Sequence, residues 1–187
     1  MRKYRIPIST EPELYIFVAI ILLLVPLKWV LAVIVCCALH ELGHLSSAKF
    51  LRIPIQRIRF GLRGTCIHMP PMLPWQELIC SAAGPLSGLI PLLFYRTFPE
   101  AALCAVFLTI YNLFPIDPSD GMRILRCILL FIFGNHTAAK LTTIVATTLC
   151  IIIFVLGFIG TFILHLGILP IASVIFLALC RKREKMP

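Results

Sequence analysis

The stretch 36-CCALHELGHLSSAKF-50 places two histidines and a glutamate inside an apolar run. The chain from Trp29 to Cys37 is almost wholly hydrophobic, and Lys49 is the first charged residue after His44. Ionisable side chains at membrane depth are costly, so they usually serve a function. The stretch therefore predicts a helix that lies in a membrane and carries a chemical site.

The composition of the chain indicates a membrane protein. Hydrophobic residues make up 60% of the sequence and the mean hydropathy is +1.00, well above the values of soluble domains. A membrane-spanning helix uses about 20 apolar residues, so the chain has room for roughly six. We expect an all-α membrane protein that forms a single transmembrane domain over residues 1–187, with its first apolar segment retained as a helix.

Apolar runs separated by proline, glycine and charge predict six transmembrane helices, at 13–27, 29–51, 75–95, 100–114, 138–160 and 163–180. Residues 52–74 do not fit a membrane helix, because charge alternates there with Ile55, Ile58 and Phe60. Glycines and prolines then break the pattern. We expect a short re-entrant or β-hairpin-like segment after the second helix.

Lysine and arginine are distributed unequally between the two sides of this topology. Fifteen fall on one side, and only Lys28 and Arg96 fall on the other. The positive-inside rule therefore predicts a multi-pass protein of the cell membrane with both termini in the cytoplasm. Because topology accounts for the net charge of +9, we expect the lipid bilayer as a partner and no nucleic acid.

The spacing of His40 and His44 predicts a metal site. On a helix, residues four apart share one face, so both imidazoles can bind the same Zn²⁺ ion. Glu41, beside the first ligand, can act as general base toward a zinc-activated water. Two histidines that only hydrogen-bond within the membrane are the alternative, but the complete HExxH pattern favours the metal. The eight scattered cysteines are interpreted as small apolar residues rather than as disulfides or a metal cluster.

A third metal ligand has to be found, because a catalytic zinc usually has three protein ligands and one open position. The stretch 111-YNLFPIDPSDGMRIL-125 ends the fourth predicted helix on the same side as HELGH. The acids within reach of that side are Asp117, Asp120 and Glu77. The residues alone leave the choice among these three open. His68 and His136 are less favoured rivals, because a histidine in a connecting segment more often faces solvent or is satisfied by a hydrogen bond.

Three blocks of the sequence, 40-HELGH-44, 82-AAGPLSG-88 and 112-NLFPIDPSDG-121, resemble the site-2 protease family of intramembrane zinc metalloproteases. Their order and the six-helix layout are similar too, and the chain resembles a minimal form of the sporulation branch without its CBS domain. The resemblance implies that Asp120 is the third zinc ligand and that Asn112 lines the site and binds substrate. It also implies that Ala82–Gly88 packs against the catalytic helix.

The expected function is hydrolysis of a peptide bond in or near a transmembrane segment of a membrane-tethered substrate, close to the cytoplasmic face. The 52–68 segment could hold an unwound substrate by strand addition. A non-proteolytic membrane chaperone or regulator that retains the zinc site is the alternative. A metal transporter fits less well, because the polar ligands gather on one side of the membrane. The substrate, its cleavage site and the oligomeric state are not indicated.

Overall fold

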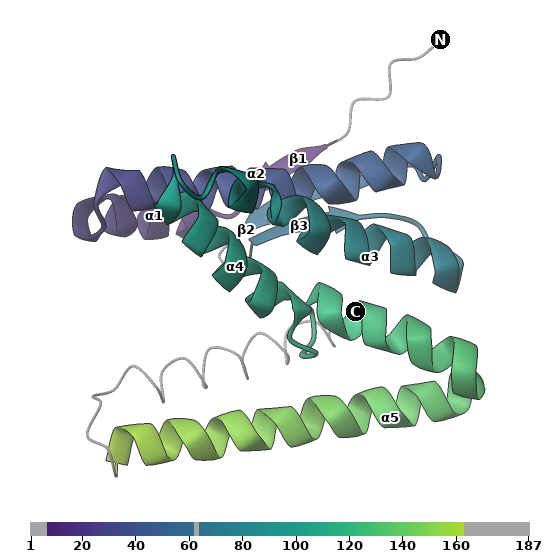
Figure 1. The fold of residues 1–187 in the computed structure, drawn as a ribbon. Coiled ribbons are helices and arrows are strands. Elements are labelled where there is room, and N and C mark those ends of the chain that lie inside the picture. Colours follow the sequence, from purple (N-terminus) through teal and green to yellow (C-terminus); the bar gives the residue numbers. More distant parts are fainter. Residues whose placement is uncertain (1–6, 62–63, 163–187) are drawn as a thin grey trace. The chain divides into compact units, whose positions relative to one another are not determined.

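The computed structural model describes residues 7–61 and 64–162 (Figure 1). Their elements follow in the order β1 (Ile8–Thr10), α1 (Pro12–Leu24), α2 (Leu27–Phe50), β2 (Arg57–Gly61), β3 (Gly64–His68), α3 (Pro74–Gly88), η1 (Ile90–Phe94), α4 (Pro99–Leu113) and α5 (Asp120–Phe162). By its internal packing the chain divides into two compact units, Met1–Asn112 and Leu113–Pro187. Each is described separately below, and the single protease domain stays a prediction.

Prolines mark the beginnings of several helices. Pro12, Pro74 and Pro99 each occupy the first position of a helix, and α2 begins directly after Pro26. The first turn leaves its backbone N–H groups without a partner inside the helix, so a residue that lacks an N–H costs nothing there. The predicted helices 13–27, 29–51 and 100–114 are confirmed as α1, α2 and α4 to within a few residues.

Two predicted helices differ from the structure. The helix expected at 75–95 is divided, because α3 ends at Gly88 and the chain continues as the tighter helix η1 around Pro91. The helix expected at 138–160 corresponds to the second part of the longer element α5, whose first part, beginning at Asp120, was not predicted. Gly134 interrupts α5 with φ of 74°, and the chain reverses there into two helical arms, 120–133 and 135–162 (Figure 1). The helix predicted at 163–180 lies outside the described residues.

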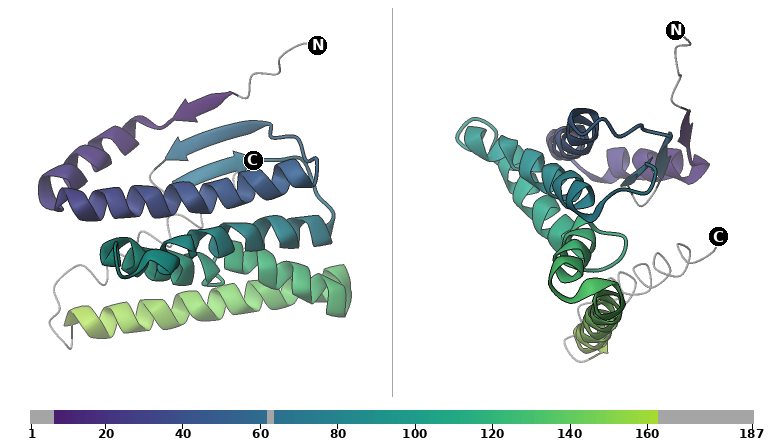
Figure 2. Two further views of the ribbon diagram at one scale, coloured as in Figure 1. Left: turned by 45° about the horizontal axis from the view of Figure 1, so that its top comes forward. Right: turned by 90° about the vertical axis from the view of Figure 1, so that its right-hand side faces the viewer.

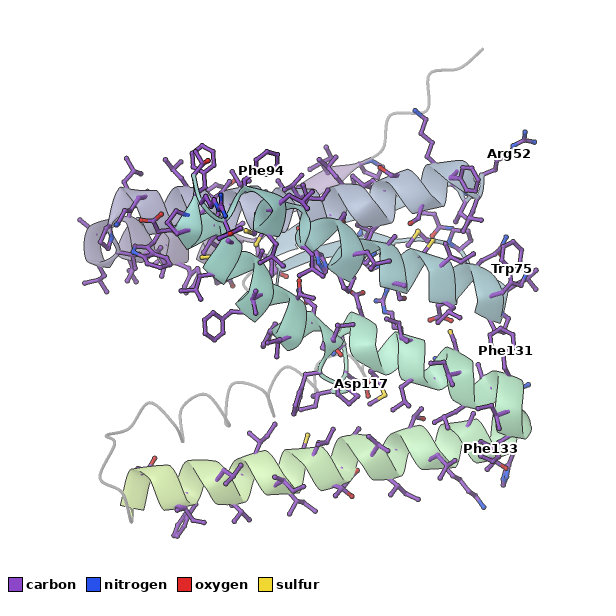
Figure 3. All side chains as sticks on the ribbon, viewed as in Figure 1. Arg52, Trp75, Phe94, Asp117, Phe131 and Phe133 are labelled. Atoms are coloured by element: carbon purple, nitrogen blue, oxygen red, sulfur yellow. The ribbon has the colours of Figure 1, made fainter. Side chains whose placement is uncertain are left out.

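Within residues 7–61 and 64–162, three helical stretches are long and apolar enough to cross a membrane, namely Leu27–Phe50, Pro74–Phe94 and Asp120–Ile159. Helices α1 and α4 are apolar but shorter, so six spans are not confirmed. No residue of α1 is buried, and Leu23 and Leu24 are 85% and 76% exposed. Trp75 at the start of α3 and Phe94 at the end of η1 lie at opposite ends of one stretch (Figure 3), as aromatic side chains do at the two membrane interfaces. These exposed apolar surfaces suit lipid rather than water.

A small sheet corrects the all-α expectation. Strands β2 and β3 form the antiparallel hairpin anticipated after the second helix, with Ile58 opposite Ile67. Strand β1, which was not predicted, pairs in parallel with the other edge of β2, with Ile8 opposite Ile58. The order is β1-β2-β3, so β3 is an edge strand among the described residues (Figure 2). A strand of three residues has too little pattern of its own to be recognised, because its order comes from the partner.

The end of α2 fixes where the hairpin begins. Arg52 has φ of 57°, a left-handed conformation, directly after the helix (Figure 3). Its N–H donates to Lys49 O at 3.1 Å, and the N–H of Ile53 donates to Ala48 O at 2.8 Å. These two bonds make a Schellman motif, and its usual apolar contact is present because Ala48 and Ile53 share a buried cluster with Cys80. The motif stops the helix and directs the chain toward the sheet.

Helices α2 and α3 pack through small residues. A side chain at Gly43 would overlap the backbone of Ala83 and the hydroxyl of Ser87, so the two helices are in backbone contact there. The Ser87 hydroxyl donates to Leu39 O of α2 at 2.9 Å and is also 2.9 Å from Gly84 O. Small residues four apart allow such close approach within membranes. The expected packing of the Ala82–Gly88 block against the HELGH helix is present.

Candidate metal centre

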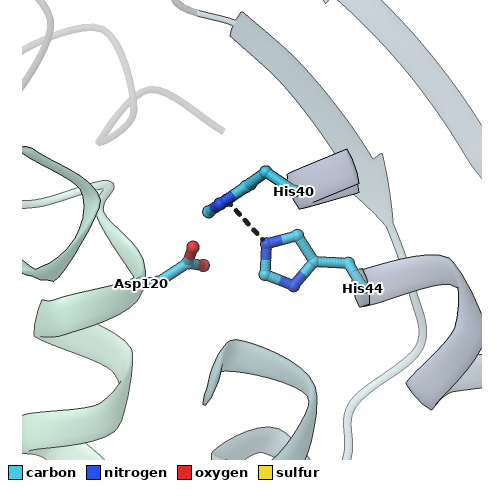
Figure 4. A group of neighbouring side chains, drawn as sticks. All are labelled: His40, His44 and Asp120. Carbon is cyan, nitrogen blue, oxygen red and sulfur yellow. Dashed lines mark hydrogen bonds between the residues drawn. The ribbon is translucent and has the colours of Figure 1, made fainter. Parts of the chain in front are cut away.

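The two histidines of the HELGH motif face each other in the first unit. His40 and His44 lie one turn apart on α2, with their Nε2 atoms 3.1 Å apart. Their ring centroids are 4.8 Å apart and the rings are nearly perpendicular. His40 is only 6% exposed, and His44 is partly buried. Figure 4 draws these two side chains and the bond between them.

A backbone carbonyl fixes the protonation of His44. Its Nδ1 lies 2.8 Å from Cys80 O on α3. A carbonyl oxygen can only accept a hydrogen bond, so Nδ1 carries the proton and donates it. In the neutral ring Nε2 then presents a lone pair, which is the form that ligates a metal. Such an outer hydrogen bond both selects the tautomer and orients the ring. The donor set at His44 thus fits a metal ion.

Two glycines of α3 make room for the two rings. A side chain at Gly84 would overlap the Nε2 and Cε1 atoms of His44. One turn later, a side-chain carbon built at Gly88 would lie 3.5 Å from Nδ1 of His40. The helices run in opposite directions here, so Gly84 faces His44 and Gly88 faces His40. The i, i+4 spacing of the glycines therefore matches that of the histidines. Only a residue without a side chain fits at Gly84.

Asp120 begins helix α5 in the second unit, and its surroundings are set by its neighbours. The backbone N–H of Met122 donates to the Ser119 hydroxyl at 3.2 Å, so Ser119 caps the helix. A side chain at Gly121 would overlap the backbone of Leu113, which explains the glycine after the aspartate. Asp120 is 8% exposed, whereas Asp117 is exposed. A carboxylate in the first turn of a helix is also favoured by the helix dipole.

The other residues selected from the sequence have more ordinary positions. Glu41 follows His40 on α2 and is partly buried, and Glu77 lies in the first turn of α3. The Asn112 side-chain amide donates to Leu108 O of its own helix at 3.0 Å. The seven cysteines in the described part of the chain are free thiols, of which Cys36, Cys80 and Cys127 are buried.

Two contacts of this site were not predicted. The carbonyl of Cys80 that holds His44 leaves no signal in the sequence, because every residue has a carbonyl. Thr109, which is 6% exposed on α4, was overlooked as well. Its hydroxyl would lie 3.6 Å from a side chain at Gly88, on the side of His40. A lone threonine inside the apolar run 101–110 was the available signal.

Comparison with known proteins agrees with these features. No family model matches the sequence. A zinc metalloprotease of Methanocaldococcus jannaschii is 30% identical over an alignment that covers 66% of this chain and 40% of that relative. The solved structure of a site-2 protease from the same organism superposes with a TM-score of 0.70 at 25% identity, covering 100% of this chain and 94% of that one.

These matches support the chain as a member of the site-2 protease family. The resemblance of the three sequence blocks to that family is thereby confirmed. The chain spans 40% of the length of the curated relative. Activity, substrate and partners are therefore treated as proposals.

Proposed function

We propose that the protein is an intramembrane zinc metalloprotease. It hydrolyses a peptide bond in or near a transmembrane segment of a membrane-tethered substrate, close to the cytoplasmic face. The observation that carries the proposal is the facing pair His40 and His44 on an apolar helix, with the tautomer of His44 fixed by Cys80 O and Glu41 beside the pair. Family membership supports it, since the curated relative is named a zinc metalloprotease.

The proposed zinc ligands are His40, His44 and Asp120. His40 and His44 present facing Nε2 atoms in the first unit, and Asp120, which begins α5 in the second unit, is the third ligand that the family resemblance implies. Two imidazoles and one carboxylate are a usual donor set for a catalytic zinc, which keeps a further position open. Asp120 is favoured over Asp117 because it is the buried one of the two residues, at 8% exposure. When bound, zinc supplies Lewis acidity to the scissile carbonyl and to the attacking water.

Glu41 is the proposed general base and acid. Its carboxylate accepts a proton from the attacking water and later delivers that proton to the nitrogen of the leaving amine. Its position next to a ligand on the same rigid helix keeps it at a constant distance from the metal. Asn112 is proposed to bind the substrate carbonyl, which requires its amide to leave Leu108 O.

The proposed depth and orientation are supported by charges at the ends of the helices. Lys28 near the start of α2 forms an ion pair with Glu100 near the start of α4, with 2.8 Å between Nζ and Oε1. These two helices therefore begin on the same side, the one that holds few cations. The HELGH motif lies in the other half of α2, near Lys49 and Arg52. We propose that this cationic side, with both termini, is cytoplasmic.

Strand β3 is the proposed docking edge for the substrate. A helical substrate hides its peptide bonds, so it must become extended before cleavage. With β1 on one side of β2 and β3 on the other, β3 can accept a further strand. Its register places Ile67 beside Ile58 on the partly buried face, which leaves the main-chain edge as the point of contact.

Two measurements test the proposed function. Zinc bound per purified chain is determined for the wild type, Asp120→Ala and the matched control Asp117→Ala. We expect about one zinc in the wild type and the control and a loss in Asp120→Ala. Cleavage of a membrane-tethered model substrate is then measured for the wild type and for Glu41→Gln. The variant should keep its zinc and lose activity. A wild type that binds zinc and equals Glu41→Gln in cleavage would favour the regulator instead. No zinc in a folded wild type rejects the site.

A further inference from the structure

The side chain of Thr109 is unusual for a threonine in a helix. Its residue is 6% exposed, and among the described residues its Oγ1 atom has no hydrogen-bond partner. A threonine inside a helix normally donates to the carbonyl one turn earlier or faces solvent. Thr142 and Thr143 of α5 follow the usual pattern, each donating to Ala139 O or Ala138 O at 2.9 to 3.0 Å. A buried hydroxyl without a partner costs free energy and calls for an explanation.

The space next to this hydroxyl is bounded by Gly88 and His40. A side-chain carbon built at Gly88 would lie 3.6 Å from Oγ1 of Thr109, 3.5 Å from Nδ1 of His40 and 3.7 Å from Cβ of His40. The two polar atoms, from two different helices, therefore border the same point beside Gly88, where the glycine has no methyl group; this point is called the Gly88 notch. A single water molecule can bridge polar atoms that border the same space.

We propose that Thr109 is a positioning residue for the zinc ligand His40, and that one water in the Gly88 notch links its Oγ1 to Nδ1 of His40. This inference rests on the proposed function and specifies its ligand environment. When Nε2 of His40 offers its lone pair to zinc, the ring proton is on Nδ1. That proton then donates to the water, and the water donates to the threonine hydroxyl. His44 receives the equivalent support directly from Cys80 O.

The link explains why the two ligands are supported differently. His44 lies against the backbone of α3, close enough for a carbonyl to reach its ring. His40 lies farther from α3, since even a side-chain carbon built at Gly88 would be 3.5 Å from its Nδ1, so a water and a side chain from α4 take the place of a direct backbone contact. Loss of such an outer hydrogen bond typically lowers metal affinity about tenfold to a hundredfold.

The test measures Zn²⁺ affinity of the full-length protein by competition with a chelator. Thr109→Val replaces the hydroxyl by a methyl of the same shape, and Thr142→Val is the control that removes a hydroxyl from another helix. We expect about tenfold weaker binding in Thr109→Val, near wild-type binding in Thr109→Ser, and no change in Thr142→Val. The absorption bands of bound Co²⁺ should shift in Thr109→Val and be restored in Thr109→Ser, because the hydroxyl orients the ring.

Further variants keep the outcome decisive. If valine disturbs the fold, Thr109→Ala is compared with Thr109→Ser, since these differ only in the hydroxyl. Gly88→Ala fills the notch but keeps Thr109, and it should weaken zinc binding as much as Thr109→Val. The proposal is overturned if Thr109→Val or Gly88→Ala binds zinc as tightly as the wild type. It is also overturned if Thr109→Ser and Thr109→Ala have equal zinc affinity. A wild type that binds no zinc rejects the proposed function itself.

Discussion

Replacing Gly84 by alanine should remove His44 from the metal centre. The added methyl would overlap Nε2 and Cε1 of the His44 ring, whereas real side-chain carbons keep a distance of about 3.4 Å. The ring, or the whole of α3, must therefore move by about 1 Å. That displacement exceeds the tolerance of a Zn–N bond, which is about 0.2 Å around a length of roughly 2.0 Å. It also strains the 2.8 Å bond from His44 to Cys80 O.

The size of the effect follows from the loss of one ligand. Structural zinc sites with four ligands bind with about 10 to 16 kcal/mol, so one ligand contributes roughly 3 kcal/mol. Gly84→Ala should therefore bind zinc at least about a hundredfold more weakly than the wild type. Chelator competition measures the affinity, and circular dichroism checks that the helices are retained.

Gly88→Ala is the matched comparison for this prediction. It adds the same methyl one turn along α3, and the same gain in helix propensity of about 1 kcal/mol, but its nearest neighbours are at 3.5 to 3.7 Å. It should lose only the tenfold that the water link contributes. The reasoning is refuted if Gly84→Ala keeps wild-type affinity, or if both alanines weaken zinc equally.

Three further outcomes are expected. Arg52→Gly should raise the free energy of unfolding by about 0.5 to 1 kcal/mol, because glycine adopts the φ of 57° without strain. Thermal unfolding in detergent measures this gain, and no gain would mean that Arg52 is unstrained. Ser119→Ala should lower the free energy of unfolding by about 1 kcal/mol by removing the cap of α5, and it should also weaken zinc binding by disturbing Asp120. Unchanged stability and zinc affinity would contradict the capping role. A proline scan over 65–67 on β3 should slow cleavage at the positions whose N–H faces away from β2 while zinc remains bound, and a uniform response would argue against strand addition.

Much of the first unit could be predicted because its signals are local. The HELGH spacing on an apolar run determines both the helix and the shared face of His40 and His44. The Ala82–Gly88 block predicts close packing, since glycines four apart in an apolar helix have few other uses. The hairpin after α2 followed from charge alternating with isoleucine and phenylalanine. Each of these patterns is contained within a short stretch of the chain.

The parts that were missed depend on contacts distant in sequence or on single backbone angles. Strand β1 exists through its pairing with β2. The reversal at Gly134 requires one φ value, and a glycine within an apolar helix does not reveal it. Asp117 and Asp120 could not be separated from the residues alone, because both stand beside proline or glycine. They differ in burial, which only the folded chain reveals, because Asp120 is 8% exposed and Asp117 is exposed.

The antiparallel match between the histidines of α2 and the glycines of α3 gives a criterion for recognising distant members of this architecture. A chain with H-x₃-H in one apolar segment should carry a small-residue pair at the same spacing in the next, read in reverse order. The interval between the two pairs can vary freely, since it is a connecting hairpin. A chain with the histidine pair but bulky residues at both partner positions would have to hold its rings by other means. Paired spacings therefore provide a search pattern that needs no overall sequence identity.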